Sequence, residues 1–328
     1  MNKQELENEE VRQEEKKTKK KKVRKKKTMF GHIRSIISIL LVVGIIGGSY
    51  WYYAFQYRAE VEPETNRKVT NTDSVYTMEQ YLKTLKRNQT VYKYACDEAE
   101  VDNDYGTYVV PGLKSTRTLK VKGDGEAEVC TSMTPQGLAF TEDYILVSAY
   151  CKTKAHDSVI YVIDKESRRF VKEIVLNTKA HVGGMAYDTM NQILWVTGQG
   201  STWAQANAIT LSHLENYSFD DGYHPIEFDM SYNLYKIKRA SFMTYHDGAL
   251  FVGFFTQDNA SVIEKYLINA DGTLYEKEDM NLKRTVGVTE PVAYAVSMQV
   301  ISGKVQGMAF YNNKILLTRS WGILPSEV

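Results

Sequence analysis

The chain has 328 residues, of which 43% are hydrophobic and 25% charged, and its formal net charge at pH 7 is only +1. Its three cysteines are not in CxxC spacing, so a structural metal site of that type is excluded. The near-neutral total hides an uneven distribution. Residues 1–34 carry 13 Lys and Arg against six Asp and Glu, whereas the remainder carries 28 basic and 34 acidic residues.

The N-terminal region predicts a basic tail followed by a membrane anchor. Residues 1–32 are polar and are expected to be disordered, with a basic cluster at Lys16–Lys27. Residues 33–56 are the expected transmembrane helix, because Ser35–Tyr57 holds 23 residues without a charge, enough to cross ~30 Å of hydrocarbon. A cleaved signal peptide is the alternative. The long basic leader and the missing Ala-x-Ala site favour an uncleaved signal anchor.

The charge bias predicts the topology of a single-pass cell-membrane protein. Positive residues stay on the cytoplasmic side, so the N-terminus is expected inside the cell and the C-terminal domain outside. The helix and the basic tail are expected to contact membrane lipid, and no nucleic-acid partner is expected. Residues 57–104 are expected to form a polar stalk with a short helix at Tyr76–Arg87.

A five-residue motif recurs four times in the remaining segment, residues 105–328. Each copy is followed by a few polar residues and then by an apolar strand, which is typical of the inner strands of a β-propeller. The fold expected is therefore all-β, a propeller preceded by one transmembrane helix. The copies are Gln136–Phe140, Gly183–Tyr187, Ser241–Tyr245 and Gln306–Phe310.

The strands around these motifs predict the blades. Residues 134–176 form the first complete four-stranded blade, and blades at about 181–238 and 239–280 follow. Wide motif spacing and the Val-rich stretch Glu290–Ile301 suggest a further blade, about five in all, and an incomplete last blade is an alternative. Strands within Thr107–Val121 are candidates for closing the ring, and an open ring is the alternative.

The stretch Ser158–Asp164, followed by Phe170–Val171 and Ile174–Val175, resembles the YVTN-type repeat of bacterial extracytoplasmic propellers. The motifs at Gln136–Phe140 and Gln306–Phe310 are similar to the inner strands of YncE-like and lactonase-like propellers. This resemblance covers about residues 105–328. It implies a propeller used for extracytoplasmic binding or as a scaffold, with hydrolase activity in some relatives.

Polar residues at the start of the inner strands are the candidate ligand site. Two sets with period-two spacing would face the mouth of a central channel. Their basic, amide and hydroxyl groups suit an anionic envelope ligand or a protein partner, whereas the alternative is exposed strand ends paired with loop carboxylates. The predicted ligand-binding residues are His181, Arg239, Lys304, Gln136, Ser241 and Gln306.

The expected function is therefore a membrane-anchored binding or scaffold module, and the alternative is a lactonase or esterase. The aligned channel positions offer no carboxylates for a divalent cation, so no metal, no cofactor and no catalytic residue is assigned. His156-Asp157-Ser158 is interpreted as a polar loop. A disulfide between Cys130 and Cys151 is possible outside the cell, because hairpin pairing brings the two close.

Overall fold

The computed structural model describes residues 3–52, 83, 86–87, 89–92, 110, 113, 115–121, 125–276, 290–312, 314–321 and 326–327. The chain divides into two compact units, residues 1–60 and 61–328. Most of the expected stalk of residues 57–104, including most of the helix expected at Tyr76–Arg87, lies outside the described residues. Within it the structure describes the short helix α3 (Gln89–Tyr92).

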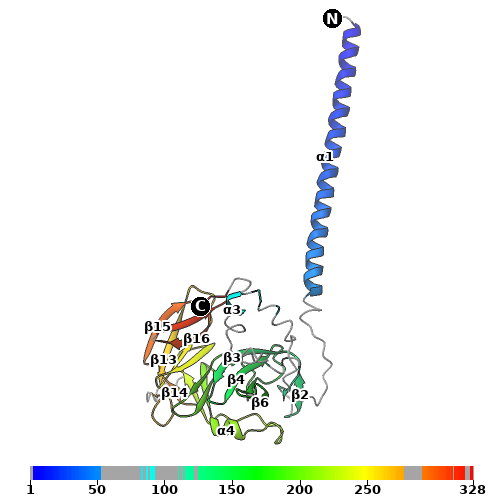
Figure 1. The fold of residues 1–328 in the computed structure, drawn as a ribbon. Coiled ribbons are helices and arrows are strands. Elements are labelled where there is room, and N and C mark those ends of the chain that lie inside the picture. The colour runs from blue at the N-terminus through cyan, green and yellow to red at the C-terminus, as the bar shows by residue number, and fades with distance from the viewer. Residues whose placement is uncertain are drawn as a thin grey trace. The chain divides into compact units, whose positions relative to one another are not determined.

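The first unit contains one long helix, α1 (Lys3–Tyr52) (Figure 1). Its stretch Gly31–Trp51, with a mean hydropathy of 1.9, is long and apolar enough to cross a membrane by length and composition, as membrane anchors and signal sequences both are. The disorder expected over residues 1–32 is not found, because the helix already begins at Lys3. Glu, Lys, Gln and Arg are strong helix formers, and no Gly or Pro interrupts them before Gly31.

The second unit is mostly β and begins its main body with the sheet expected from the first motif. Four antiparallel strands lie in chain order and pair in sequence. The expected four-stranded arrangement of residues 134–176 is thereby confirmed. The strands are β3 (Met133–Phe140), β4 (Tyr144–Cys151), β5 (Val159–Asp164) and β6 (Phe170–Val175).

The second sheet has five strands in the order β14-β10-β9-β8-β7. A short helix, α4 (Leu211–Asn216), follows β9 and is capped by the Thr210 side chain, which accepts a hydrogen bond from the backbone N–H of His213. The last strand of this sheet comes from a distant part of the chain and runs parallel to its neighbour. The strands are β7 (Met185–Asp188), β8 (Ile193–Gln199), β9 (Ala204–Thr210), β10 (Met230–Leu234) and β14 (Val292–Ala293).

The third motif begins a four-stranded sheet, and the fourth begins a two-stranded one. The segment Glu290–Ile301 does not form the further blade expected from the sequence. It supplies β14 to the second sheet and β15 to the third, so a count of five blades is not confirmed among the described residues. The strands are β11 (Phe242–His246), β12 (Ala249–Gly253), β13 (Ala260–Leu267), β15 (Ser297–Ser302), β16 (Val305–Tyr311) and β17 (Lys314–Arg319).

The sheets are stacked face to face in chain order through separate apolar layers. Leu146 and Ile160 of the first sheet share a core with Leu194 of the second. Trp195 of the second sheet shares another with Leu250 of the third, and further layers join the third sheet to β16 and β17. Burial of these faces is the main source of stability. This stacking resembles successive propeller blades, although no closed ring is detected among the described residues.

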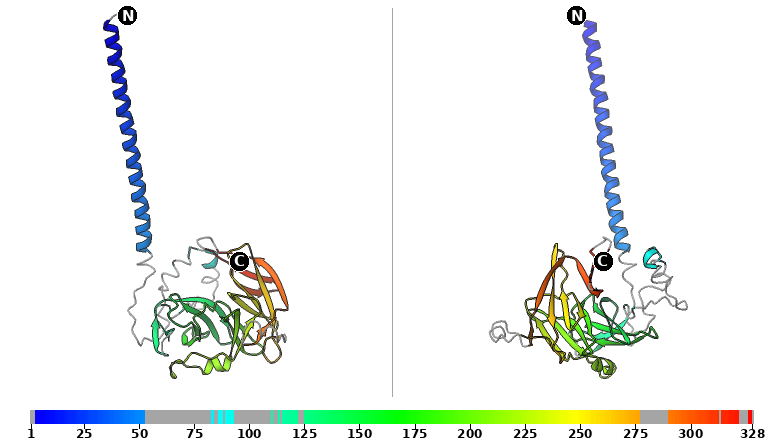
Figure 2. Two further views of the ribbon diagram at one scale, coloured as in Figure 1. Left: turned by 180° about the vertical axis from the view of Figure 1, so that it is seen from behind. Right: turned by 60° about the vertical axis from the view of Figure 1, so that its left-hand side comes forward.

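The hairpin of β1 (Thr116–Leu119) and β2 (Ala127–Cys130) does not complete the last sheet, as strands within Thr107–Val121 were expected to do. It packs instead on the outer face of the first sheet, where Leu119 and Cys130 join the core around Val147. In three views, β2 and β15 lie on opposite sides of the unit (Figures 1 and 2). The described part of residues 107–121 therefore covers the first sheet rather than closing a ring.

The first strands of the four sheets lie next to one another in the order β3, β7, β11, β16. Glycines permit this approach. A Cβ at Gly137 would lie 2.9 Å from the carbonyl oxygen of Gly183, and a Cβ at Gly183 would lie 2.5 Å from that of Ser241. The Ser148 hydroxyl reinforces the first junction: it accepts a hydrogen bond from the Gly137 N–H and donates one to the Val182 carbonyl.

Gly183→Ala is expected to lower the free energy of unfolding by about 1–3 kcal/mol, because its methyl group would overlap backbone that cannot move without separating two strands. Gly307→Ala is the matched control, since its Cβ would meet only the Thr318 hydroxyl, at 2.9 Å. Urea unfolding of the full-length chain in mild detergent measures both changes. Equal destabilisation by the two substitutions would contradict the strand-contact explanation.

Candidate functional site

A cavity of about 750 Å³ lies where the inner strands begin. Gln136 and Gln306 reach it from within β3 and β16, and Ser241 from the position directly before β11. His181 lies four residues before β7, and Arg239 lies two residues before Ser241. The close approach of these strands brings together residues that are up to 170 positions apart in the sequence. Hydroxyl groups of Thr178 and Thr197 add further polar atoms to the wall.

Four basic side chains line this cavity: Lys154, Lys179, His181 and Arg239. No Asp or Glu lines it in the part of the chain that the structure describes, and none of the four forms an ion pair there. Asp157 is close enough to Lys179 for their charges to interact. The wall thus concentrates positive charge together with neutral hydrogen-bonding groups, which is the arrangement expected for attracting an anion.

His181 reports the electrostatics of the cavity. Its ring stacks on Tyr150 with the centroids 3.9 Å apart and the planes 18° from parallel. Burial lowers the pKa of His181, and the positive charges of Lys154 and Arg239 lower it further. Since each cation disfavours a second positive charge nearby, the imidazole is held in its neutral form at neutral pH. A neutral imidazole can donate or accept a hydrogen bond from this position.

Ser241 is held in place by the chain around it. Its Oγ accepts a hydrogen bond from the Phe255 N–H at 3.0 Å, which links the start of β11 to the loop after β12. The amides of the two glutamines are less committed. Gln136 donates to the Pro135 carbonyl at 2.8 Å, and Gln306 makes a long contact of 3.5 Å with the Ser320 carbonyl. Rotation of either side chain would free its amide for a ligand.

The structure brings together five of the six residues selected from the sequence, and Lys304 is the exception. Lys304 occupies the turn between β15 and β16 with a φ of 65°, and its N–H donates to the Thr256 carbonyl. The period-two rule holds only within an extended strand, so it does not apply at this left-handed position. Lys304 is not among the residues that line the cavity.

Two cavity lysines were missed. Lys154 lies in the turn after β4 with a φ of 57°, and Lys179 lies between β6 and β7. Neither occupies a motif strand, so alignment of the motifs gives no sign of them. Lys179 had a weak signal, because it stands two residues before His181 in the same connection. No feature of the sequence points to Lys154. The path of its turn depends on contacts with the β1–β2 hairpin, where the Val121 N–H donates to the Ala155 carbonyl.

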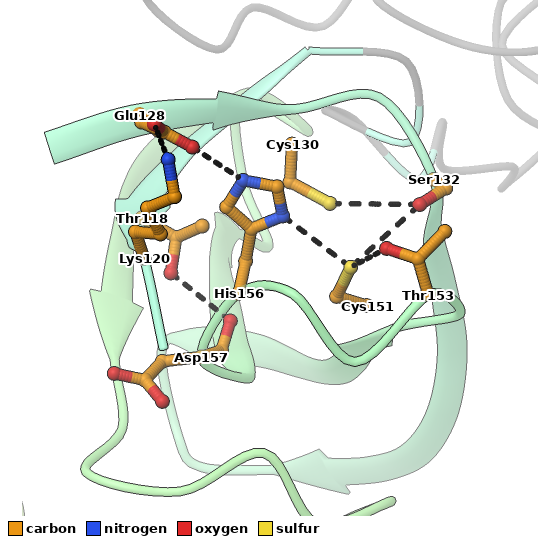
Figure 3. A network of polar contacts seen from close by, with 9 residues as sticks. All are labelled: Thr118, Lys120, Glu128, Cys130, Ser132, Cys151, Thr153, His156 and Asp157. Carbon is orange, nitrogen blue, oxygen red and sulfur yellow. Dashed lines mark hydrogen bonds and ion pairs between the residues drawn. The ribbon is translucent and has the colours of Figure 1, made fainter. Parts of the chain in front are cut away.

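The second cluster of interest lies beneath the β1–β2 hairpin and contains both cysteines of the predicted disulfide (Figure 3). Cys130 and Cys151 are buried and are present as free thiols, with their sulfur atoms within 4.8 Å of each other. The predicted proximity is confirmed, and the disulfide itself stays a prediction. His156, expected to be part of a polar loop, also points into this cluster, and its Nδ1 lies 3.4 Å from the Cys151 sulfur.

Comparison with known proteins assigns no family, since no family model and no curated protein matches the sequence. Solved structures that overlap with it include hydrazine synthase of Kuenenia stuttgartiensis, at 15% identity and a TM-score of 0.36, and glutaminyl cyclase of Myxococcus xanthus, at 14% and 0.33. The overlaps cover 63% and 57% of this chain, but only 49% and 62% of those chains. Overlaps this weak assign no activity. The resemblance to YVTN-type propellers stays a prediction.

Arg239→Gln is expected to raise the pKa of His181, because it removes one of the two cations that disfavour the imidazolium. The rise is partial, since burial is the larger cause and remains. NMR titration of the His181 ring protons in the full-length chain measures it. Lys304→Gln is the matched control, with the same loss of charge outside the cavity wall. An unchanged pKa in Arg239→Gln, or an equal rise in the control, would contradict the described electrostatics.

Proposed function

We propose that this chain is a membrane-anchored, propeller-type binding module whose central cavity takes an anionic ligand. One observation carries the proposal: four basic side chains surround one cavity that no described carboxylate lines. Gathering the charges of Lys154, Lys179 and Arg239 in this way costs electrostatic free energy in the folded protein. A bound anion would offset that cost. The cluster of positive charges would then serve ligand binding rather than stability.

The propeller assignment is supported by the order of the strands. The first strands of four sheets are neighbours in chain order, and each sheet packs its face on the next. In propellers such strands surround a central channel whose mouth is a usual place for ligands. The cavity lies near the starts of these strands, which supports the assignment.

Membrane anchoring is supported by Gly31–Trp51 and by the charges that precede it. Positive residues are retained on the cytoplasmic side, so the β-rich unit is expected outside the cell. A tagged C-terminus should then be removed by a protease added to intact cells, while a cytoplasmic marker protein stays whole. Protection of the tag until the cells are lysed would contradict this topology.

The chemistry of the wall favours phosphate or carboxylate ligands. Arg239 offers a planar pair of N–H donors that suits the oxygen atoms of either group, while Lys154 and Lys179 act as point charges. Ser241, Thr197 and the glutamine amides can bind hydroxyl or ester oxygens beside the charge. A volume of about 750 Å³ would admit a small anion or one segment of an anionic envelope polymer.

The hydrolase alternative gains no support from the residues of the cavity. A lactonase-type propeller holds its divalent cation with carboxylate and amide oxygens, and the cation polarises the substrate carbonyl. In the described chain the wall offers glutamine amides but no Asp or Glu. Its positive charges would repel a cation rather than attract one.

Arg239→Gln and Lys154→Gln are each expected to weaken anion binding by about tenfold or more, because each removes a charge-assisted contact worth about 1.5–3 kcal/mol. Calorimetric titrations of the full-length chain with inorganic phosphate, citrate and a glycerol phosphate oligomer measure the effect. Lys152→Gln is the matched control, since Lys152 is exposed in the same turn and does not line the cavity.

Binding should also weaken as the salt concentration rises, because screening reduces the attraction between exposed charges. The proposal fails if none of the three anions binds to the wild-type chain. It fails equally if the Lys152→Gln control loses as much affinity as the two cavity variants.

A further inference from the structure

The three side chains of the second cluster come from separate parts of the fold. Cys130 ends β2, Cys151 ends β4, and His156 lies in the connection between β4 and β5. The potential ligand atoms, two sulfurs and one ring nitrogen, all lie within 4.8 Å of one another (Figure 3). Neutral imidazole and thiolate are the ligands that zinc prefers in proteins.

The separation of the Cys151 sulfur and the His156 ring nitrogen agrees with an edge of a metal tetrahedron. Ligands at about 2.3 Å for sulfur and about 2.0–2.1 Å for nitrogen stand roughly 3.6 Å apart when they share one tetrahedral zinc ion. The Cys151 sulfur and the His156 Nδ1 are separated by 3.4 Å. The Ser132 hydroxyl lies 3.8 Å from the Cys130 sulfur and 3.7 Å from the Cys151 sulfur, on the side of the sulfurs away from the His156 ring.

A carboxylate behind the histidine fixes the direction of its ring. The His156 Nε2 lies 3.1 Å from the Oε2 atom of Glu128, and the other oxygen of Glu128 accepts from the Lys120 ammonium at 2.7 Å. Donation from Nε2 to the carboxylate leaves Nδ1 with its lone pair towards the sulfur atoms. Metal-binding histidines commonly have such a carboxylate partner, which sets the tautomer and strengthens the ligand.

Burial argues against a nucleophilic role for this cysteine–histidine–glutamate arrangement. The exposed fractions of Cys130 and Cys151 are 0% and 1%, so a substrate cannot reach either sulfur. The same burial suits a site whose task is to join segments. The ligands connect the β1–β2 hairpin to the first sheet and to the turn after β4, which backbone hydrogen bonds, apolar packing and side-chain contacts such as Thr116–Tyr161 and Thr118–Asp157 also join.

We propose that Cys130, Cys151 and His156 bind a zinc-type divalent ion, with a water molecule as the fourth ligand. The ion joins the β1–β2 hairpin to the first sheet. This site is separate from the proposed anion-binding cavity, and its existence does not depend on the function proposed for that cavity.

The test is the metal content of the full-length chain, purified in mild detergent without chelators and supplied with zinc under reducing conditions. Mass spectrometry of the elements should find about one zinc per chain. His156→Gln should lose that zinc, while Cys96→Ser, which removes a cysteine outside the described residues, should keep it. Wild-type chain without zinc, or His156→Gln with its zinc retained, would overturn the proposal.

Cobalt replacement keeps the proposal testable if His156→Gln does not fold. Wild-type chain loaded with Co²⁺ should show the strong visible absorption of a tetrahedral site and a sulfur-to-cobalt charge-transfer band. A spectrum without the charge-transfer band would overturn the assignment. A disulfide between Cys130 and Cys151 that persists under reducing conditions, identified by peptide mass mapping, would overturn it too, because both sulfur ligands would be consumed.

Discussion

The fold of the β-rich unit depends on backbone contact between strands that begin successive sheets. Gly183 lies so near the Ser241 carbonyl that a single added carbon would stand 2.5 Å from it, and Gly137 meets the Gly183 carbonyl in the same way. Neighbouring sheets can converge here only because their inner strands carry no side chain at the point of contact. Away from this contact the sheets diverge, and large apolar side chains such as Trp195 and Leu146 fill the space between them.

This convergence is also what makes a site out of scattered residues. The first residues of the inner strands and the loops before them meet at one end of the contact between these strands. His181 and Arg239 therefore reach the same cavity from loops that lead into different sheets. The cost is repulsion among like charges: burial is the larger cause of the lowered pKa of His181, and the charges of Lys154 and Arg239 lower it further. Stability alone would favour a nearby carboxylate. None of the described residues that line the cavity is a carboxylate, and Asp157 interacts only from nearby with Lys179, which is the observation behind the proposed anionic ligand.

Sequence alone could predict what is local and repeated. The motif recurs at equivalent positions of successive sheets, so the four strands of the first sheet and five residues that line the cavity could be predicted from spacing. Prediction from the sequence failed where strands pair with distant parts of the chain. Glu290–Ile301 looks like a strand pair of its own, yet β14 joins β10 and β15 joins β13. It failed again at Lys304, whose left-handed backbone turns the side chain out of the strand pattern. Hydrophobic periodicity predicts neither which strands pair with each other nor the sign of a residue's φ angle.

The two sites are joined by one short turn, residues 152–156, which sequence periodicity could not have connected to either. Cys151 directly before this turn and His156 at its end belong to the buried cluster, while Lys154 in the middle of the turn lines the cavity. The turn is short: the Lys154 N–H donates to the Cys151 carbonyl, and Lys154 takes a positive φ that favours glycine. Fixing Cys151 and His156 to one ion would therefore limit where the Lys154 ammonium can lie. A metal at the proposed site would then order part of the proposed anion site without touching the anion.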